Sequence, residues 1–368
     1  TPHTTWQGGN ITVPIVPAGV TGINRYYPSP RVSQYSAGIQ QQMGSKAVLS
    51  VSYVGSVARH LSYWQELNLP DPSQLASLTS TSNHVGTDGV SHFNQLVPYK
   101  GYTQLRQAFN GANSHYNSLQ MELRGHVARD LQLQAAYTLS RAIDPATGST
   151  GNGWDLNSIT NPYAGWQYDV GPSALDRTSV AFVNFIYDIP LLRNSSSRAL
   201  KTMLGGWSLS GIVTMQSGTP LNVTVSGNNV ASLFTGGVGN RPDKVSAISY
   251  PKSPVVSSKG QVTGIQWVNL SAFAAPTAGQ WGTLPFDALR GPGRHNWNLS
   301  LFKSFLLSES RGSRFEFRAD AFNAWNHTQF GGAGQNGGFH TGFDGGQAGQ
   351  ITSAFNPREL QLGAKLIF

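Results

Sequence analysis

The amino-acid sequence predicts an all-β, antiparallel fold, and two observations carry this prediction. The first is composition, because the 368 residues include 42 Gly and 20 Pro, which favour frequent turns over long helices. The second is a period of two in many segments, where apolar and polar side chains alternate as they do on the two faces of a strand. The chain should therefore form many strands, each with one apolar and one polar face.

The alternation is clearest in LQLQAAYTLS, residues 131–140, and it returns in ELQLGAKLIF, residues 359–368. We count about nine such segments of about ten residues each, the length that crosses a bilayer when a strand is tilted. No run of about 18 apolar residues occurs, so a membrane-spanning helix is excluded. In chain order, the predicted strands are residues 33–43, 47–57, 115–125, 131–140, 178–189, 206–217, 296–305, 314–325 and 359–368.

The connections between these strands are alternately short and long. A soluble sandwich has no reason to sort its loops in this way, whereas an outer-membrane barrel has short periplasmic turns and long external loops. The pattern therefore predicts a transmembrane antiparallel β-barrel. The short connections are residues 43–46, 126–130, 191–206 and 306–313, and the long ones are residues 58–114, 142–177, 218–295 and 327–358.

A sheet of about nine strands does not close well, because bacterial single-chain barrels have even, antiparallel strand counts. An open sheet would leave a row of unpaired backbone groups in lipid along each edge. We therefore expect further strands upstream of Thr1, with residues 32–368 as the C-terminal portion of a larger barrel. Residues 1–31 would be an external loop segment or the end of a preceding strand. Alternatively GNITVPIVP, residues 9–17, supplies a tenth strand, although its two prolines remove ladder donors.

Charge and cysteine content limit the possible partners. The net charge is +8, but Lys and Arg are scattered without a dense basic run, which indicates solvated or lumen-facing charge and no nucleic-acid partner. The chain has no Cys, which excludes a disulfide framework and a thiolate metal site. We expect no cofactor.

Longer segments carry a family resemblance. SQYSAGIQQQMGSKAVLSVSYVGSVARHL, GANSHYNSLQMELRGHVARDLQLQAAYTLSRAID and RFEFRADAFNAWNHTQFG resemble successive blocks of the Oar-like TonB-dependent receptors, a carboxypeptidase-regulatory-like domain-containing type common in Acidobacteria. The resemblance implies the C-terminal part of a barrel of about 22 strands in the outer membrane of a Gram-negative bacterium. It also implies uptake of a ligand, for example a saccharide or a peptide, bound by external loops.

The resemblance implies several partners. Outer-membrane lipid and lipopolysaccharide would surround the wall, and the barrel-assembly machinery would read the C-terminal aromatic, Phe368, as an assembly signal. The TonB complex would act through a plug, but this sequence shows neither a plug nor a TonB box, so the plug is not in this chain.

Aromatic side chains fall into two groups. Those near strand ends are expected to anchor the wall at the headgroup level; they are Trp64, Tyr163, Trp166, Trp207, Trp297 and Trp325. Those farther out in the long loops either pack the loops on themselves or stack on a flat ligand. These ligand-binding candidates are Tyr99, Tyr102, Trp154, Trp267 and Trp281.

Polar residues on the wet face of the strands are expected to line the lumen, where opposite charges can pair across strands and contact a plug. The lumen-facing candidates are Gln120, Glu122, Arg124, Arg318, Asp320 and Lys365.

Enzyme and metal motifs are better explained as loops. GAGQNG, residues 332–337, matches GxGxxG, but the residues that follow cannot begin a helix. His84, Asp88 and His92 have a helical metal-site spacing, but two intervening glycines oppose the helix. No GxSxG elbow occurs. We predict a protein that is not an enzyme and holds no metal.

Three functions remain open. The first is a transporter of the family just described. The second is a surface adhesin or binding receptor that uses the barrel only as an anchor. The third is a soluble β-sandwich carbohydrate-binding module, which requires the apolar faces to be buried between two sheets.

Overall fold

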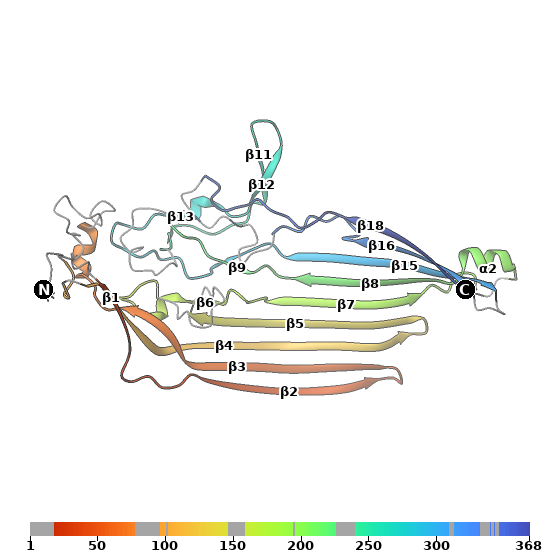
Figure 1. The fold of residues 1–368 in the computed structure, drawn as a ribbon, viewed down its shortest axis with the longest axis horizontal. Coiled ribbons are helices and arrows are strands. Elements are labelled where there is room, and N and C mark those ends of the chain that lie inside the picture. The colour runs from red at the N-terminus through yellow and green to blue at the C-terminus, as the bar shows by residue number, and fades with distance from the viewer. Residues whose placement is uncertain are drawn as a thin grey trace, which may run out of the picture.

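The computed structural model describes residues 18–77, 96–100, 102–145, 159–193, 196–225, 240–308, 313–331, 339, 342 and 346–368. Its main element is one antiparallel sheet whose strands follow each other in chain order from one edge to the other (Figure 1). In order, these strands are β2 (Arg31–Met43), β3 (Ala47–Glu66), β4 (Tyr102–Ala128), β5 (Leu131–Pro145), β7 (Ser179–Asp188), β8 (Trp207–Gln216), β15 (Arg294–Ser308), β16 (Ser313–Phe322) and β18 (Glu359–Ile367).

Each predicted strand appears at its expected place, so the all-β antiparallel prediction is confirmed. Several strands are longer than expected, and the largest extensions are in β3 and β4. The strand β3 continues to Glu66 and β4 begins at Tyr102, so the predicted 58–114 connection is reduced to residues 67–101. Bulges interrupt the pairing of β3 with β4 after Ala58 and again after Leu61. A bulge shifts the alternation of side chains between faces, and the period of two is therefore lost from the sequence there.

The pairing register places the apolar rows of all these strands on one face. In the middle of the sheet, Leu299 lies opposite Gly211, Gly211 opposite Phe185, and Phe185 opposite Leu133. A Cβ at Gly211 would lie 2.6 Å from the Phe185 ring, so glycine makes room for the aromatic side chain across this row.

The apolar face is exposed. Away from the edges of the sheet, Leu139 on β5 and Leu119 on β4 are still 45% and 38% exposed on this face. The three smaller sheets in the described part of the chain involve only short strands within the long connections. A soluble sandwich requires the apolar face to be buried between two sheets, and the described part of the structure does not have this arrangement.

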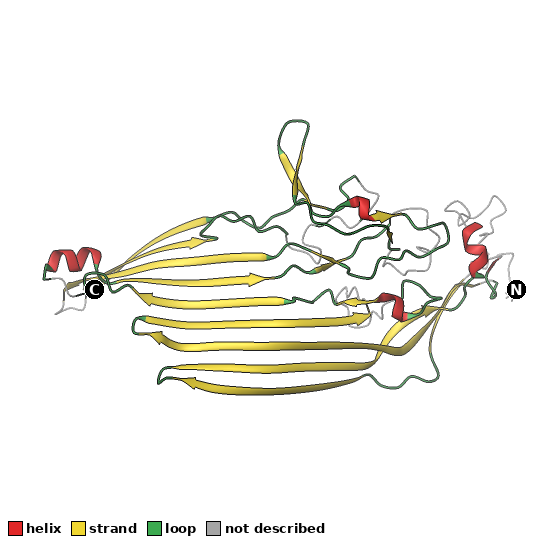
Figure 2. Ribbon diagram, turned by 180° about the vertical axis from the view of Figure 1, so that it is seen from behind, coloured by secondary structure: helices red, strands yellow, loops and turns green. Residues whose placement is uncertain are grey.

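The two ends of the sheet differ (Figure 1, Figure 2). We call one the loop end, where residues 67–101, 146–178, 217–293 and 323–358 connect the strands. We call the other the turn end, where residues 44–46, 129–130, 189–206 and 309–312 connect them. The turn end carries helix α2 (Arg198–Leu204) and the C-terminus.

The remaining elements are short, and β1 pairs in parallel with the beginning of β4. Among the described residues, no helix has the length and apolar character needed to cross a bilayer. The short elements outside the main nine strands and α2 are β1 (Ala18–Ile23), η1 (Pro72–Ser77), η3 (Trp166–Asp169), β6 (Val170–Pro172), β9 (Pro220–Leu221), β10 (Asp243–Lys244), β11 (Ser253–Val256), β12 (Val262–Gln266), η5 (Leu270–Ala272), β13 (Phe273–Ala274), β14 (Leu289–Arg290) and β17 (Gln350–Ile351).

Candidate ligand-facing loop layer

The long connections at the loop end pack on an apolar core of their own, and we call this assembly the loop layer. The core joins residues 217–293 to residues 323–358, so two connections far apart in sequence fold together. Its buried members are Leu221, Val223, Ile265, Trp267, Val268, Ala272, Phe273, Leu284, Leu289, Phe339 and Ile351.

A buried ion pair joins the 217–293 connection to the 146–178 connection. The side chains of Arg241 and Asp169 are only 1% and 5% exposed, and their charged atoms lie 2.9 Å apart. Arg241 also donates to the carbonyls of Leu284 and Tyr168, at 2.9 and 2.7 Å. The other oxygen of Asp169 accepts from the Thr160 amide at 2.6 Å. Both charged groups therefore have hydrogen-bond partners besides each other. Such extra hydrogen bonds offset the cost of removing an ion pair from water.

The Arg241 guanidinium also stacks over the ring of Tyr168, 3.9 Å from its centroid. The Tyr168 hydroxyl donates to the carbonyl of Gly282 at 2.6 Å. Burial raises the pKa of Tyr168 to about 12. This aromatic contact reinforces the same junction between connections.

A second ion pair ties the loop layer to the wall. Arg290 contacts Asp176 at 2.6 Å, and the Asp176 carboxylate also accepts from the Ala142 amide of β5 at 2.7 Å. The Asp176 side chain is fully buried. The loop layer is therefore fixed to the end of the sheet.

Near this junction lie two acids, Asp144 and Asp287. Burial raises the pKa of the Asp287 carboxyl group to about 7, and the nearby Asp144 carboxyl group adds to this effect. Asp287 has a φ of 49°, in the left-handed region that non-glycine residues seldom adopt. Packing of the loop layer holds this residue in place.

Trp281 and Trp267, two of the proposed ligand-binding aromatics, pack within the loop layer. The Trp281 indole donates to the Thr160 carbonyl at 2.9 Å, and its ring meets Tyr163 edge-on with centroids 5.4 Å apart. Trp267 is buried, and its indole donates to the Arg290 carbonyl at 2.7 Å. Each indole therefore has a partner within the protein.

Tyr163 was expected at the edge of the wall, but it belongs to the loop layer. Its hydroxyl donates to the Pro70 carbonyl at 2.7 Å, which links the 146–178 connection to the 67–101 connection. Burial raises the pKa of Tyr163 to about 12. Tyr163 therefore joins three connections, because its ring contacts Trp281 and its hydroxyl contacts Pro70.

Tyr99 and Tyr102 differ from the two tryptophans because their rings are exposed, Tyr99 at 56%. Tyr102 is the first residue of β4 and not a loop residue as expected. The Asn68 side chain holds both residues by donating to their carbonyls at 3.2 and 3.1 Å and accepting from the Tyr99 amide at 3.0 Å. The backbone is fixed while the rings stay available.

Several residues singled out in the sequence lie outside the described residues. They are Trp154, His84, Asp88, His92 and the glycine-rich residues 332–337.

The six lumen-facing candidates lie on one face of the sheet, opposite to the apolar rows. Arg318 and Asp320 on β16 form an ion pair at 2.8 Å, and Lys365 on β18 lies opposite Glu316. The β4 residues lie several strands away, so the sheet does not bring the two groups together.

On β4, Gln120, Glu122 and Arg124 follow one another along the polar face. Glu122 accepts a hydrogen bond from Gln134 of β5 at 3.1 Å, and Arg124 lies opposite Gln134 in the register. These side chains form a polar ladder between β4 and β5.

Aromatic pairs mark both ends of the apolar face. Trp297 meets Trp325 edge-on near the loop end, with ring centroids 6.2 Å apart. Phe305 meets Phe315 near the turn end, at 6.0 Å. Trp297 and Phe305 are separated by about 27 Å along β15, close to the height of about 25 Å for the apolar band of an outer-membrane barrel.

Sequence reasoning did not identify the charged residues that hold the loop layer, namely Arg241, Asp169, Arg290 and Asp176. Only 11% of the residues are charged, so a single charged residue in an otherwise aromatic or uncharged loop segment, as in WQYD, stands out. This pattern is the sequence signal that could have pointed to these residues. Within the described ranges, no three side chains of His, Cys, Asp or Glu gather as metal ligands would.

Comparison with protein families agrees with this architecture. A family model described as the outer membrane beta barrel domain matches residues 1–361. The chain is similar to the outer membrane transporter YddB of Escherichia coli at 11% identity, covering 93% of this chain and 33% of that one, with a TM-score of 0.40. Comparison with curated proteins returned no match.

Two further structures show a similar likeness. For the pyoverdine outer membrane receptor FpvA of Pseudomonas aeruginosa PAO1, identity is 11%, coverage 92% of this chain and 30% of that one, and the TM-score 0.39. For BauA, the ferric preacinetobactin receptor of Acinetobacter baumannii, identity is 10%, coverage is 91% of this chain and 29% of that one, and the TM-score is 0.38. The chain spans about a third of the length of these structures, 33% for the first.

Proposed function

The chain belongs to the family of the outer membrane beta barrel domain, and from this premise we propose that it is the C-terminal wall section of an Oar-like TonB-dependent receptor. The wall lies in the outer membrane with its apolar face toward lipid and its polar face toward the lumen. The loop end faces the outside of the cell, and the loop layer binds a ligand, such as a saccharide or a peptide, for uptake.

The observation that carries the ligand-binding part of this proposal is the folded loop layer at one end of a single-layer wall. Loops that served only as connections would not need a buried ion pair such as Arg241 with Asp169 or an anchor to β5 such as Asp176. A packed layer presents exposed groups in fixed positions, which lowers the entropy lost on binding. Among the aromatic candidates that the structure describes, Tyr99 and Tyr102 are left exposed.

The polar face supports transport over simple anchoring. Ion pairs and amides such as Arg318 with Asp320 and Glu122 with Gln134 are suited to contacts with a plug in the lumen. A surface adhesin or binding receptor is the second candidate, and the folded loop layer is equally compatible with it. The two candidates differ in whether the protein contacts TonB.

The experiment is a binding assay between the detergent-solubilised full-length protein and the purified periplasmic domain of TonB from the same bacterium. The proposal predicts a complex between them. Removal of the segment upstream of this chain from the full-length gene should abolish binding, because the coupling sequence would lie in that segment. If the intact protein, correctly inserted in the outer membrane, does not bind TonB, the anchored receptor is the better explanation.

We also propose that Phe368 is recognised by the barrel-assembly machinery. Phe368 is 94% exposed and follows the last residue of β18, so its removal takes little packing from the folded wall. Deletion of Phe368 from the full-length protein should nevertheless lower the amount in the outer membrane and leave unassembled chain in the periplasm.

The control is Leu360→Ala, a loss of another exposed apolar side chain from the same terminal strand. Immunoblots of membrane and periplasmic fractions compare the two variants. Equal amounts of both in the outer membrane would show that Phe368 has no special role in assembly.

A further inference from the structure

Helix α2 at the turn end has an apolar stripe that nothing in the described part of the chain covers. Leu200, Met203 and Leu204 have the i, i+3, i+4 spacing of one helix face. They are 47%, 69% and 48% exposed. Lys201 lies beside this stripe and is also exposed. A short helix with an exposed apolar stripe beside a basic side chain has the composition of a helix at a membrane interface.

The position of α2 follows from Lys303 of β15. In the sheet register, Lys303 lies directly opposite Trp207 on one side and Phe317 on the other, so its side chain leaves the sheet on the apolar face. It is only 2% exposed. Its ammonium group donates to the carbonyls of Met203 and Gly205, at 2.9 and 2.5 Å.

These two hydrogen bonds fix the last turn of α2 to the lipid-facing side of the wall. The ammonium group also lies 5.2 Å from the Trp207 ring centroid and 4.6 Å from that of Phe305. A lysine near the edge of an apolar face normally extends its ammonium group toward water or headgroups. Here the last turn of α2 provides its acceptors instead.

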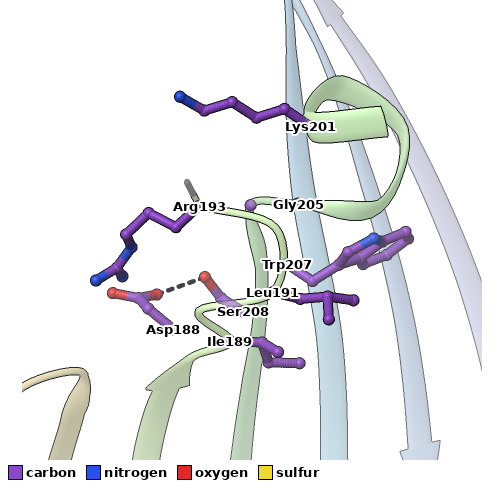
Figure 3. A pocket seen from close by; sticks show the side chains of 9 residues that line it. Asp188, Ile189, Leu191, Arg193, Lys201, Gly205, Trp207 and Ser208 are labelled. Atoms are coloured by element: carbon purple, nitrogen blue, oxygen red, sulfur yellow. Dashed lines mark hydrogen bonds between the residues drawn. The ribbon is translucent and has the colours of Figure 1, made fainter. Parts of the chain in front are cut away.

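The other side of the 189–206 connection is polar (Figure 3). A hollow of about 360 Å³ lies beside this connection, and its lining includes Ile189, Leu191 and Trp207 as well as polar residues. The Asp188, Arg193 and Lys201 side chains point to the same side (Figure 3). Arg193 is tied to Asp130 of the neighbouring turn at 2.7 Å. The connection thus also carries a group of charged side chains (Figure 3).

We propose that α2 is an interfacial anchor whose Leu200, Met203 and Leu204 insert into the phospholipid leaflet that surrounds the turn end. Continuity supports this occupant, because Lys303 places α2 on the same face as the apolar rows of the wall. Charge supports it as well, because Lys201 lies beside the stripe, where phospholipid phosphates begin. With the loop end outside the cell, this leaflet is the periplasmic one.

The test uses the full-length protein in vesicles of phosphatidylethanolamine and phosphatidylglycerol. This chain contains no Cys, so a single nitroxide label can be attached to Met203→Cys, or to Lys201→Cys as the matched control, once any upstream cysteine is replaced. Electron paramagnetic resonance then compares collisions with oxygen, which concentrates in lipid, and with a water-soluble nickel chelate.

At residue 203 we expect oxygen collisions to exceed nickel collisions several-fold, and at residue 201 the reverse. Equal, water-like accessibility at both positions would overturn the proposal. So would a label at residue 203 that is shielded from both reagents, because α2 would then be covered by protein. The measurement does not depend on which leaflet is involved, so it can succeed even if the proposed orientation or TonB dependence is wrong.

A second variant tests the hydrogen bonds of Lys303. Lys303→Met should increase the mobility of the label at residue 203, because the last turn of α2 loses its contact with the wall. Lys365→Met, on the polar face, is the control and should leave the label unchanged. If Lys303→Met also leaves the label unchanged, Lys303 does not position α2.

Discussion

At the scale of single residues, a few buried charges determine how the loop layer is held. Arg241 and Asp169 are almost inaccessible to water, and each has a further hydrogen-bond partner, the Leu284 carbonyl for Arg241 and the Thr160 amide for Asp169. Removing one member of such a pair leaves an uncompensated buried charge, which costs about 3–5 kcal/mol. Stability of the loop layer should therefore depend on Asp169 far more than on ion pairs of the wall.

We predict that Asp169→Asn lowers the protection of loop-layer amides against hydrogen exchange by a factor of about 100 or more, since each factor of ten corresponds to about 1.4 kcal/mol. The matched control is Asp320→Asn, which removes the partner of the largely exposed Arg318 and should cost at most about 1 kcal/mol. Similar small losses of protection in both variants would mean that the buried pair does not hold the layer.

The loop layer should also respond to pH through Asp287. Burial raises the pKa of Asp287 to about 7, against about 4 in an unfolded chain. The folded layer therefore keeps this proton up to a higher pH than the opened one. Its stability should be highest below about pH 4 and should fall as the pH rises to 7, by about 1.4 kcal/mol per pH unit from this group.

The variant Asp287→Asn cannot ionise at this position and should lose that pH dependence. Hydrogen exchange of the full-length protein, corrected for the intrinsic exchange rate, should show a more protected loop layer in the variant than in the native protein at pH 8. At pH 4, close to the pKa of the unfolded chain, the two should be nearly equal. A native loop layer equally protected at both pH values would contradict the assignment.

The sequence shows which residues are aromatic or charged, but not which of them meet. Trp267 and Trp281 were open to two interpretations, loop packing or ligand stacking, because an exposed and a buried indole have the same sequence signal. The contact between Arg241 and Asp169 joins residues from two separate connections. Such contacts follow from the packing of loops, which has no periodic pattern in the sequence.

At the scale of elements, the period of two predicted the strands and their faces well, because each apolar row continues across the sheet in the pairing register. Leu133 lies opposite Phe185 on one side and Gly125 on the other, well inside this face. Prediction failed at the loop-end parts of β3 and β4, where bulges break the alternation. It also missed α2, because a helix of seven residues has too few turns to show a period.

We predict that Leu133→Arg destabilises the assembled barrel, because the charge would face the lipid. An arginine on this face costs about 2–4 kcal/mol at the middle of the bilayer and less toward its edges, and Leu133 is the third residue of β5. Gln134→Arg, at the next residue but on the polar face, should cost much less. Unfolding of the full-length protein in lipid vesicles measures both changes. Equal destabilisation by the two variants would show that the faces are assigned wrongly.

At the scale of the whole molecule, the alternation of short and long connections predicted that the two ends of the sheet would differ, and they do. The loop layer could not be derived in the same way, because its core is assembled from segments far apart in the sequence, such as those of Ile265 and Ile351. The central claim that follows is an orientation, with the loop layer outside the cell and the short turns in the periplasm.

Labelling of single cysteines on intact cells tests this orientation most directly, since this chain has no Cys of its own. Val256→Cys places the thiol on the exposed hairpin of β11 and β12 at the loop end, and Arg129→Cys places it in the exposed turn between β4 and β5. In the full-length protein without upstream cysteines, an impermeant maleimide should label only residue 256 on intact cells. It should label both residues after the outer membrane is permeabilised. Labelling of residue 129 but not residue 256 on intact cells would contradict the proposed orientation.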